Sequence, residues 1–149
     1  MSIEQSSNFR RIDERLTTSG LLGVEELSAL RGEGYDAVIN LLPDTSGRAV
    51  VNEEAIVREQ GLEYVHIPVD FAAPAHADLE AFTDAMDALA GKKVHVHCAA
   101  NYRVSAFYAL YAQRTGSCTE AEADALIRSV WDPADHPPWP EFIRDERQR

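Results

Sequence analysis

Three short stretches of the chain are rich in valine, isoleucine and leucine and are bounded by turn-forming residues. They are Tyr35–Leu42, Leu62–Val69 and Lys92–Cys98, with the sequences YDAVINLL, LEYVHIPV and KKVHVHC. Short apolar runs of this composition are typical of buried β-strands. The pattern therefore predicts three strands, and the earlier segment NFRRIDERLTTSG is expected to add an edge hairpin or short strands.

Between the predicted strands, apolar residues recur at the spacing of one helix face. The three sets are Val24, Leu27 and Leu30, then Leu79, Phe82, Met86 and Leu89, and finally Val104, Phe107, Tyr108 and Tyr111. Four helical runs are followed by a glycine, at Gly34, Gly61, Gly91 and Gly116, where a left-handed residue can close the last turn. The pattern therefore predicts amphipathic helices that cover a sheet.

Polar residues mark where two further helices begin. Asn52 is expected to cap a helix that runs toward Gln60, and the sequence TEAE at Thr119–Glu122 matches a capping box. The helix that TEAE opens should end near Val130, because the following sequence DPADHPPWP is too rich in proline to continue a helix.

Strands that alternate with helices are typical of a mostly parallel sheet. We therefore expect an α/β fold of three layers, in which a central sheet of about four to five strands carries helices on both faces. The 149 residues suffice for one hydrophobic core but are few for two. We expect a single domain over residues 1–149, with a C-terminal tail of roughly residues 132–149 packed on it.

The charge of the chain argues against two classes of partner. It has 14 lysines and arginines against 25 aspartates and glutamates, which gives a net charge of -11. A protein of this charge repels nucleic acid and anionic membranes, so neither is expected as a partner. Any anion that the protein binds must be attracted by a local site.

The sequence also lacks the features of an exported or membrane protein. The start, MSIEQSSNFRR, has no apolar stretch of the kind found in secretory signals, and no segment approaches the ~20 apolar residues of a membrane span. The two cysteines, Cys98 and Cys118, form neither a disulfide framework nor a zinc motif. We therefore expect a cytoplasmic protein that needs no cofactor or metal.

The segment HCAANYR combines a cysteine and an arginine at a predicted turn from strand to helix. Backbone amides at such a turn point toward one place, and the helix dipole adds partial positive charge there. This arrangement binds anions and stabilises a thiolate, so Cys98 is a candidate nucleophile. The planar guanidinium of Arg103 can hold two oxygens of an oxyanion. Asp70 also follows a predicted strand, and sites of open α/β sheets form beyond the carboxyl ends of strands.

The sequences VHVHCAANYRVS, YVHIPVD and YDAVINLL resemble those of the protein tyrosine phosphatase superfamily, in particular small bacterial proteins similar to dual-specificity phosphatases. The resemblance covers roughly residues 9–130 and is most specific over Val94–Ser105. It implies a cysteine-dependent phosphatase that forms a cysteinyl-phosphate intermediate on a phosphorylated substrate.

The resemblance also assigns roles to individual residues. Cys98 would attack phosphorus, while Arg103 and the loop amides would hold the phosphate oxygens. Asp70 matches the aspartate that protonates the leaving group, and His97 matches the histidine that precedes the family's cysteine. The phosphate-binding loop implied by this match comprises Ala99, Ala100, Asn101, Tyr102 and Arg103.

The loop departs from the family pattern at three positions. Four residues separate Cys98 from Arg103, where the family has five. Asn101 stands in place of a glycine, and asparagine is the residue after glycine that best tolerates a left-handed conformation. The family's Ser or Thr after the arginine is Val104 here, with Ser105 one residue later as a possible supporting hydroxyl.

The shortened loop leaves three alternatives open. Rhodanese-like sulfurtransferases share the four-residue spacing and carry a persulfide on the cysteine. The chain can also be a phosphate-binding pseudophosphatase, or a structural module in which the loop is vestigial.

Several candidate residues also have a simpler structural explanation. Cys98 can be a buried apolar residue at a strand end, Arg103 a surface arginine, and Asp70 a turn residue before Pro74. Asp44 is a second candidate for the general acid, although a turn role is more typical of its sequence, LLPDT.

Histidines and aromatic residues complete the set of candidates. His66, His95 and His97 lie on predicted strands, and a metal site with Cys98 is a minor alternative to ordinary buried histidines. Trp131, Trp139 and Phe142 can line a substrate cleft, but we interpret them as a cluster that fastens the C-terminal tail.

Overall fold

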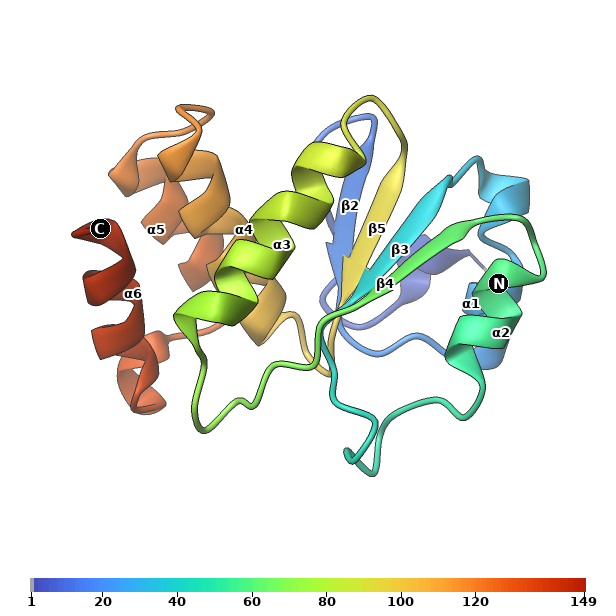
Figure 1. Cartoon of the computed structure of the whole chain (residues 1–149), viewed down its shortest axis with the longest axis horizontal. Helices are drawn as coiled ribbons and strands as arrows, with labels where there is room; N and C mark the ends of the chain where they lie inside the picture. The colour runs from blue at the N-terminus through green and yellow to red at the C-terminus, as the bar shows by residue number, and fades with distance from the viewer. Residues whose placement is uncertain (1) are drawn as a thin grey trace.

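A five-stranded sheet separates two groups of helices in the computed structural model of the chain, which describes residues 2–149 (Figure 1). The strands are β1 (Arg10–Arg11), β2 (Leu16–Ser19), β3 (Ala37–Asn40), β4 (Glu63–His66) and β5 (Val94–His97). Their order is β1-β2-β5-β3-β4, and every pair is parallel except β1 with β2. The predicted mostly parallel α/β sheet is confirmed.

The early hairpin contributes both an edge strand and an inner strand to the sheet. Its first strand, β1, forms one edge of the sheet, as predicted. Its second strand, β2, lies inside the sheet because it also pairs in parallel with the whole of β5. The end of β2 at Ser19 therefore lies beside the end of β5 at His97, next to the predicted catalytic loop.

The helices pack on both faces of the sheet. They are α1 (Val24–Ser28), α2 (Glu53–Arg58), α3 (His76–Ala88), α4 (Tyr102–Arg114), α5 (Glu120–Arg128) and α6 (Trp139–Arg147), with short 3-10 turns at Ile3–Gln5, Arg31–Glu33 and Pro133–Asp135. Figure 1 shows α3 to α6 on one side of the sheet and α1 and α2 on the other.

Alternate residues of the central strands supply two separate cores. On β3, Ala37 and Ile39 belong to the larger core with α3 to α6, while Val38 belongs to the smaller core with α1 and α2. This alternation is expected because successive side chains of a strand point to opposite faces. The strands are shorter than the predicted apolar runs because Leu41 and Leu42 leave the ladder of β3 but remain buried.

The glycine and capping-box predictions are confirmed. All four predicted glycines have φ between 83° and 90°, in the left-handed region. The Thr119 hydroxyl accepts from the amide of Glu122, whose carboxylate accepts from the amide of Thr119. Asn52 precedes α2 as predicted, but it is itself left-handed and makes no side-chain cap, so that part of the prediction is wrong.

One further expectation differs from the structure, and the C-terminal tail contains a helix that the sequence analysis did not predict. Val24 is 54% exposed, because α1 has only five residues and turns Leu27 toward the core. The C-terminal segment contains a helix, α6, which begins at Trp139, inside the proline-rich sequence, and buries Trp139, Phe142 and Ile143. Pro140 fits this helix because the first turn needs no hydrogen bond from its nitrogen.

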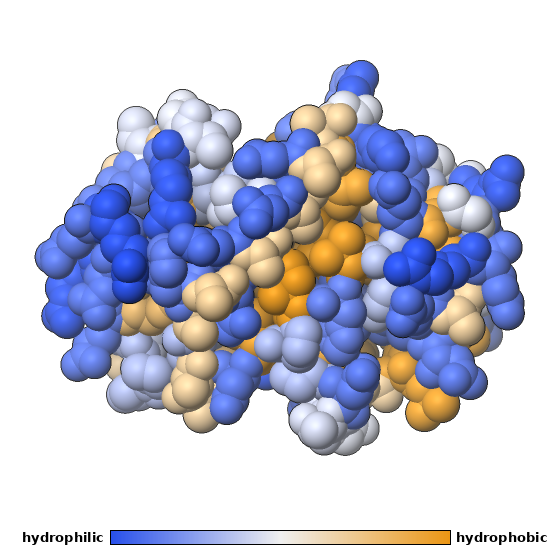
Figure 2. All heavy atoms as spheres, in the orientation of Figure 1, coloured by the Kyte–Doolittle hydropathy of each residue, from blue (hydrophilic) through white to orange (hydrophobic). Residues whose placement is uncertain are grey.

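The surface of the molecule is mostly polar. Figure 2 shows hydrophilic side chains over α5 and α6, and a strip of apolar side chains between α3 and α2. Over residues 2–149, the structure has no helix with both the length and the apolar character needed to cross a bilayer.

The core assignment predicts very different costs for two truncations. Phe82 is fully buried between the sheet and α4, so Phe82→Ala should lower the free energy of unfolding by about 3–5 kcal/mol. Val24→Ala removes atoms from an exposed side chain and should change the free energy of unfolding by less than about 0.5 kcal/mol. Urea denaturation of both variants measures the difference, and equal losses would contradict the assignment.

Candidate active site

The chain turns from β5 into α4 within four residues. Cys98 directly follows β5, and Tyr102 is the first residue of α4. Asn101 makes the turn possible with φ 69° and ψ 6°, a left-handed conformation that asparagine adopts more readily than other non-glycine residues. Asparagine therefore replaces the family's glycine without loss of the turn.

The carbonyl groups of this loop are bonded to the N-terminal part of the chain. The carbonyl of Ala99 accepts from the amide of Leu21 at 2.9 Å, and the carbonyl of Ala100 accepts from Nδ2 of Asn8 at 2.9 Å. These bonds fix the direction of both peptide groups, because a peptide's amide points opposite to its carbonyl.

The side chain of Asn101 strengthens the same attachment. Its Nδ2 donates to the carbonyl of Asn8 at 2.8 Å and to the hydroxyl of Thr18 at 3.0 Å. Its Oδ1 is buried and has no hydrogen-bond partner among residues 2–149. Gly20 lies so close to the loop that a Cβ would stand 2.7 Å from the carbonyl oxygen of Ala99.

The amides of the loop remain available to a ligand. Within the described chain, the backbone nitrogens of residues 99–103 donate no hydrogen bond to any protein group. The first amides of a helix have no partner within the helix, and together with the helix dipole they favour an anion. The loop therefore has the donors that a phosphate group requires.

The guanidinium of Arg103 makes two contacts with the segment that carries Asp70. Its Nε donates to the carbonyl of Val69 at 2.8 Å, and its Cζ lies 5.2 Å from the ring centroid of Phe71. No described residue accepts a hydrogen bond from its two terminal nitrogens. The guanidinium is thus oriented and keeps free donors.

Asp70 follows Val69 and reaches the same cavity as Arg103. The amide of Val69 donates to the carbonyl of Leu41, and the carbonyl of Val69 accepts from Arg103. Both peptide groups of Val69 are therefore anchored. The Asp70 carboxylate accepts from the amide of Ala72 at 2.9 Å and is otherwise exposed. The cavity measures about 620 Å³ and is lined by Pro43, Thr45, Ser46, Pro68, Asp70, Phe71, Ala72 and Arg103.

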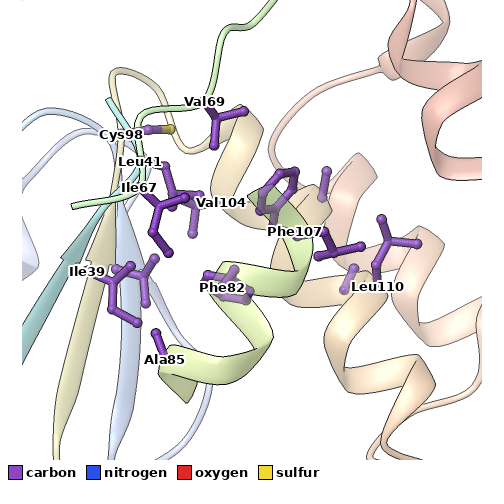
Figure 3. Packing of buried hydrophobic residues seen from close by; sticks show 14 of the residues in the cluster. Ile39, Leu41, Ile67, Val69, Phe82, Ala85, Cys98, Val104, Phe107 and Leu110 are labelled. Atoms are coloured by element: carbon purple, nitrogen blue, oxygen red, sulfur yellow. The ribbon is translucent and has the colours of Figure 1, made fainter. Parts of the chain in front are cut away.

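Cys98 lies beneath the surface rather than in the cavity wall. Its side chain has no exposed area and belongs to the larger core. Figure 3 shows its sulfur directed toward Val69, near the start of α4. The structure thus brings Asp70 and Arg103 to one cavity and keeps the thiol covered beside it.

The aromatic residues near the C-terminus fasten the Asp70 segment. The ring of Phe71 lies 5.5 Å from Trp139 and 5.7 Å from Trp131, and the Trp139 indole donates to the Phe71 carbonyl at 2.9 Å. Trp131 also stacks on Tyr102 at 4.7 Å. These residues therefore hold the tail and support the segment that carries Asp70.

Ser105 is occupied by the same cluster. Its hydroxyl donates to the carbonyl of Tyr102 at 3.1 Å and accepts from the indole of Trp131 at 3.0 Å. It is buried and is not among the residues that line the cavity of Asp70 and Arg103. Val104, which takes the place of the family's hydroxyl residue, is fully buried in the core.

His97 is buried and pairs with a residue that the sequence analysis missed. Its Nε2 lies 2.6 Å from a carboxylate oxygen of Glu53, the first residue of α2. Glu53 and His97 are far apart in sequence, and Glu53 is one of two adjacent glutamates at a helix start. Nothing in the local pattern indicated which of the two turns inward.

The other histidines have ordinary protein partners. His95 lies between the hydroxyls of Thr17 and Ser19, and burial, then the nearby charge of His97, lower the pKa of His95 well below its usual value. His66 faces the carbonyl of Leu42 at 2.7 Å. Among residues 2–149, no group of three or more histidine, cysteine or acidic side chains is arranged to hold a metal.

The candidate acid Asp44 lies apart from this cavity. Its carboxylate is exposed and is 3.9 Å from His66. It lines a second cavity of about 600 Å³ between α2 and the ends of β3 and β4. The two cavities share no lining residue, so Asp70 is the acidic residue beside Arg103.

Comparison with known proteins agrees with this geometry. Residues 8–115 match the family described as "Beta-lactamase hydrolase-like protein, phosphatase-like domain". The chain belongs to this family. It is 34% identical over 118 residues to a beta-lactamase hydrolase-like protein of Xylella fastidiosa (strain Temecula1). That alignment covers 77% of this chain and 27% of the relative, so the chain spans about a quarter of the relative's length.

Solved structures extend the likeness to nearly the whole chain. A candidate phosphatase from Shewanella putrefaciens CN-32 is 38% identical, with a TM-score of 0.87 over 96% of this chain and 93% of that one. Tk-PTP in its active form has a TM-score of 0.73 at 22% identity, over 95% of this chain and 97% of that one, which shows a shared fold. The expected fold of the protein tyrosine phosphatase superfamily is confirmed.

The close approach at Gly20 predicts that a methyl group there distorts the loop. Gly20→Ala should lower the affinity for tungstate, a tetrahedral oxyanion, by at least about tenfold, which corresponds to about 1.4 kcal/mol. Gly32→Ala is the matched control, because nothing lies within 4 Å of a Cβ at Gly32. Calorimetric titration measures both, and equal affinities would show that the loop does not depend on this contact.

Proposed function

We propose that this phosphatase-like chain hydrolyses phosphomonoesters through a cysteinyl-phosphate intermediate on Cys98. The main support is the set of free amides at residues 99–103, next to the free terminal nitrogens of Arg103. These donors suit the oxygens of a phosphoryl group, whose negative charge they stabilise as the bond to phosphorus breaks. The family match supports the same class of reaction.

The proposed reaction has two steps. In the first, the Cys98 thiolate attacks phosphorus in line with the leaving oxygen, an S–P bond forms, the P–O bond breaks, and Asp70 gives the leaving oxygen its proton. In the second, Asp70 takes a proton from water, the water oxygen bonds to phosphorus, and the S–P bond breaks. Phosphate is released and the thiolate is restored.

The burial of Cys98 requires a local opening before the first step. Val69 lies next to the thiol (Figure 3), and one of its anchors is the hydrogen bond from Nε of Arg103 to the Val69 carbonyl. A phosphate oxygen is a stronger acceptor for a guanidinium than a neutral carbonyl. Substrate binding can therefore replace this bond and uncover the thiol.

Hydrolysis of p-nitrophenyl phosphate tests the proposed function. The unmodified chain should release phosphate, Cys98→Ser should reduce the activity to background, and Asp70→Asn should lower kcat/KM by about 10²–10⁴-fold because general acid catalysis is lost. Cys118→Ser and Asp44→Asn are matched controls outside the proposed machinery and should keep full activity.

Three outcomes would contradict the proposal. Full activity in Cys98→Ser would exclude the thiolate mechanism. Thiocyanate production from thiosulfate and cyanide, without phosphate release, would show a sulfurtransferase instead. Oxyanion binding through Arg103 without turnover would show a pseudophosphatase.

A further inference from the structure

Glu53 is a buried carboxylate that contacts His97, the residue before Cys98. It is the first residue of α2, where an acidic side chain is usually exposed, yet only 6% of its surface is accessible. Its neighbour Glu54 is exposed and pairs with Arg58. Burial of an ionised carboxylate is costly unless partners compensate its charge, so the partners of Glu53 are informative.

Among residues 2–149, both hydrogen-bond partners of the Glu53 carboxylate contact the same oxygen. His97 Nε2 lies 2.6 Å from Oε2, and the Tyr64 hydroxyl donates to Oε2 at 3.2 Å. Burial raises the pKa of Tyr64, and the charge of Glu53 raises it further, so the hydroxyl keeps its proton. Asn40 Nδ2 donates in turn to the Tyr64 oxygen at 3.0 Å.

Both nitrogens of His97 face acceptors that have no proton to give. Nε2 faces the Glu53 carboxylate, and Nδ1 faces the Cys98 carbonyl at 3.4 Å. Opposite an ionised Glu53 carboxylate, a ring that donates from both nitrogens is the doubly protonated imidazolium. The neighbouring His95 differs, because its nitrogens lie 2.7 Å and 2.8 Å from the hydroxyls of Thr17 and Ser19, and hydroxyls also satisfy a neutral ring.

Within residues 2–149, Glu53 is the only charged side chain that forms a hydrogen bond or ion pair with His97. Its ring stacks on His95 of the same strand at 6.3 Å, and Cys98 follows it directly. Glu53 comes from α2, Tyr64 from β4 reaches His97 through Glu53, and Asn40 comes from β3. Glu53 is therefore the acidic group that bears on His97.

We propose that Glu53 is a positioning residue, which holds His97 as an imidazolium and thereby stabilises the thiolate of Cys98. The proposal deepens the proposed function, on which it rests. Glu53 does not touch the substrate in this account, because it lines the second cavity and not that of Asp70 and Arg103. It acts on the nucleophile through one buried side chain.

Alkylation of Cys98 by iodoacetamide tests the proposal without requiring phosphatase activity. All variants carry Cys118→Ser, and Cys98→Ser gives the background rate. The measured quantity is the ratio of the alkylation rates at about pH 9 and about pH 6, because only the thiolate reacts. A change in how often the buried thiol becomes accessible affects both rates equally and cancels in the ratio.

Glu53→Gln removes the charge and should raise this ratio by about tenfold relative to Glu54→Gln, since the thiolate is then less populated at the lower pH. The acid limb of kcat/KM should move to higher pH in the same variant. In a His97→Asn background, Glu53→Gln should have no further effect, because Glu53 acts through His97.

Equal ratios in Glu53→Gln and Glu54→Gln would overturn the proposal, and so would a full effect of Glu53→Gln in the His97→Asn background. If Glu53→Gln does not fold, Tyr64→Phe removes one hydrogen bond to the carboxylate and should raise the ratio about twofold or more. An unchanged ratio in Tyr64→Phe would then overturn it. If Glu53→Gln changes the ratio of alkylation rates but the unmodified chain releases no phosphate, the proposed function is refuted and the role of Glu53 is not.

Discussion

The candidate site depends on where the carbonyl groups of Ala99 and Ala100 point. Both are bonded to the N-terminal part of the chain, through the amide of Leu21 and the side chain of Asn8. If these carbonyls turned inward, they would place partial negative charge where an anion must bind. The hairpin of β1 and β2 is therefore more than an edge of the sheet, because the residues flanking it determine the polarity of the loop.

The same constraint explains how a four-residue loop keeps its shape. Asn101 accepts a left-handed conformation and uses Nδ2 to bind Asn8 and Thr18, two contacts that a glycine cannot make. On the other side of the site, Val69 is anchored to Leu41 and Arg103, and Trp139 holds the carbonyl of Phe71. The two segments that carry the proposed chemistry are thus fixed by separate parts of the core.

Much of this arrangement could be predicted from sequence because it is local. The apolar runs predicted β3, β4 and β5, and the order of strand, cysteine and helix start predicted the loop. Glu53 and Asn8 could not be predicted, because each acts on residues more than 40 positions away and neither stands in a distinctive pattern. The exposure of Val24 and the helical tail were missed because helix length and tertiary packing decide them.

A crystal structure with bound tungstate is the most direct measurement of the central claim. The account predicts the tetrahedral oxyanion within hydrogen-bond distance of the amides of residues 99–103 and of the Arg103 guanidinium, with its central atom facing the Cys98 sulfur. A loop whose carbonyls face the anion, or an anion bound only away from Cys98 and Arg103, would contradict it.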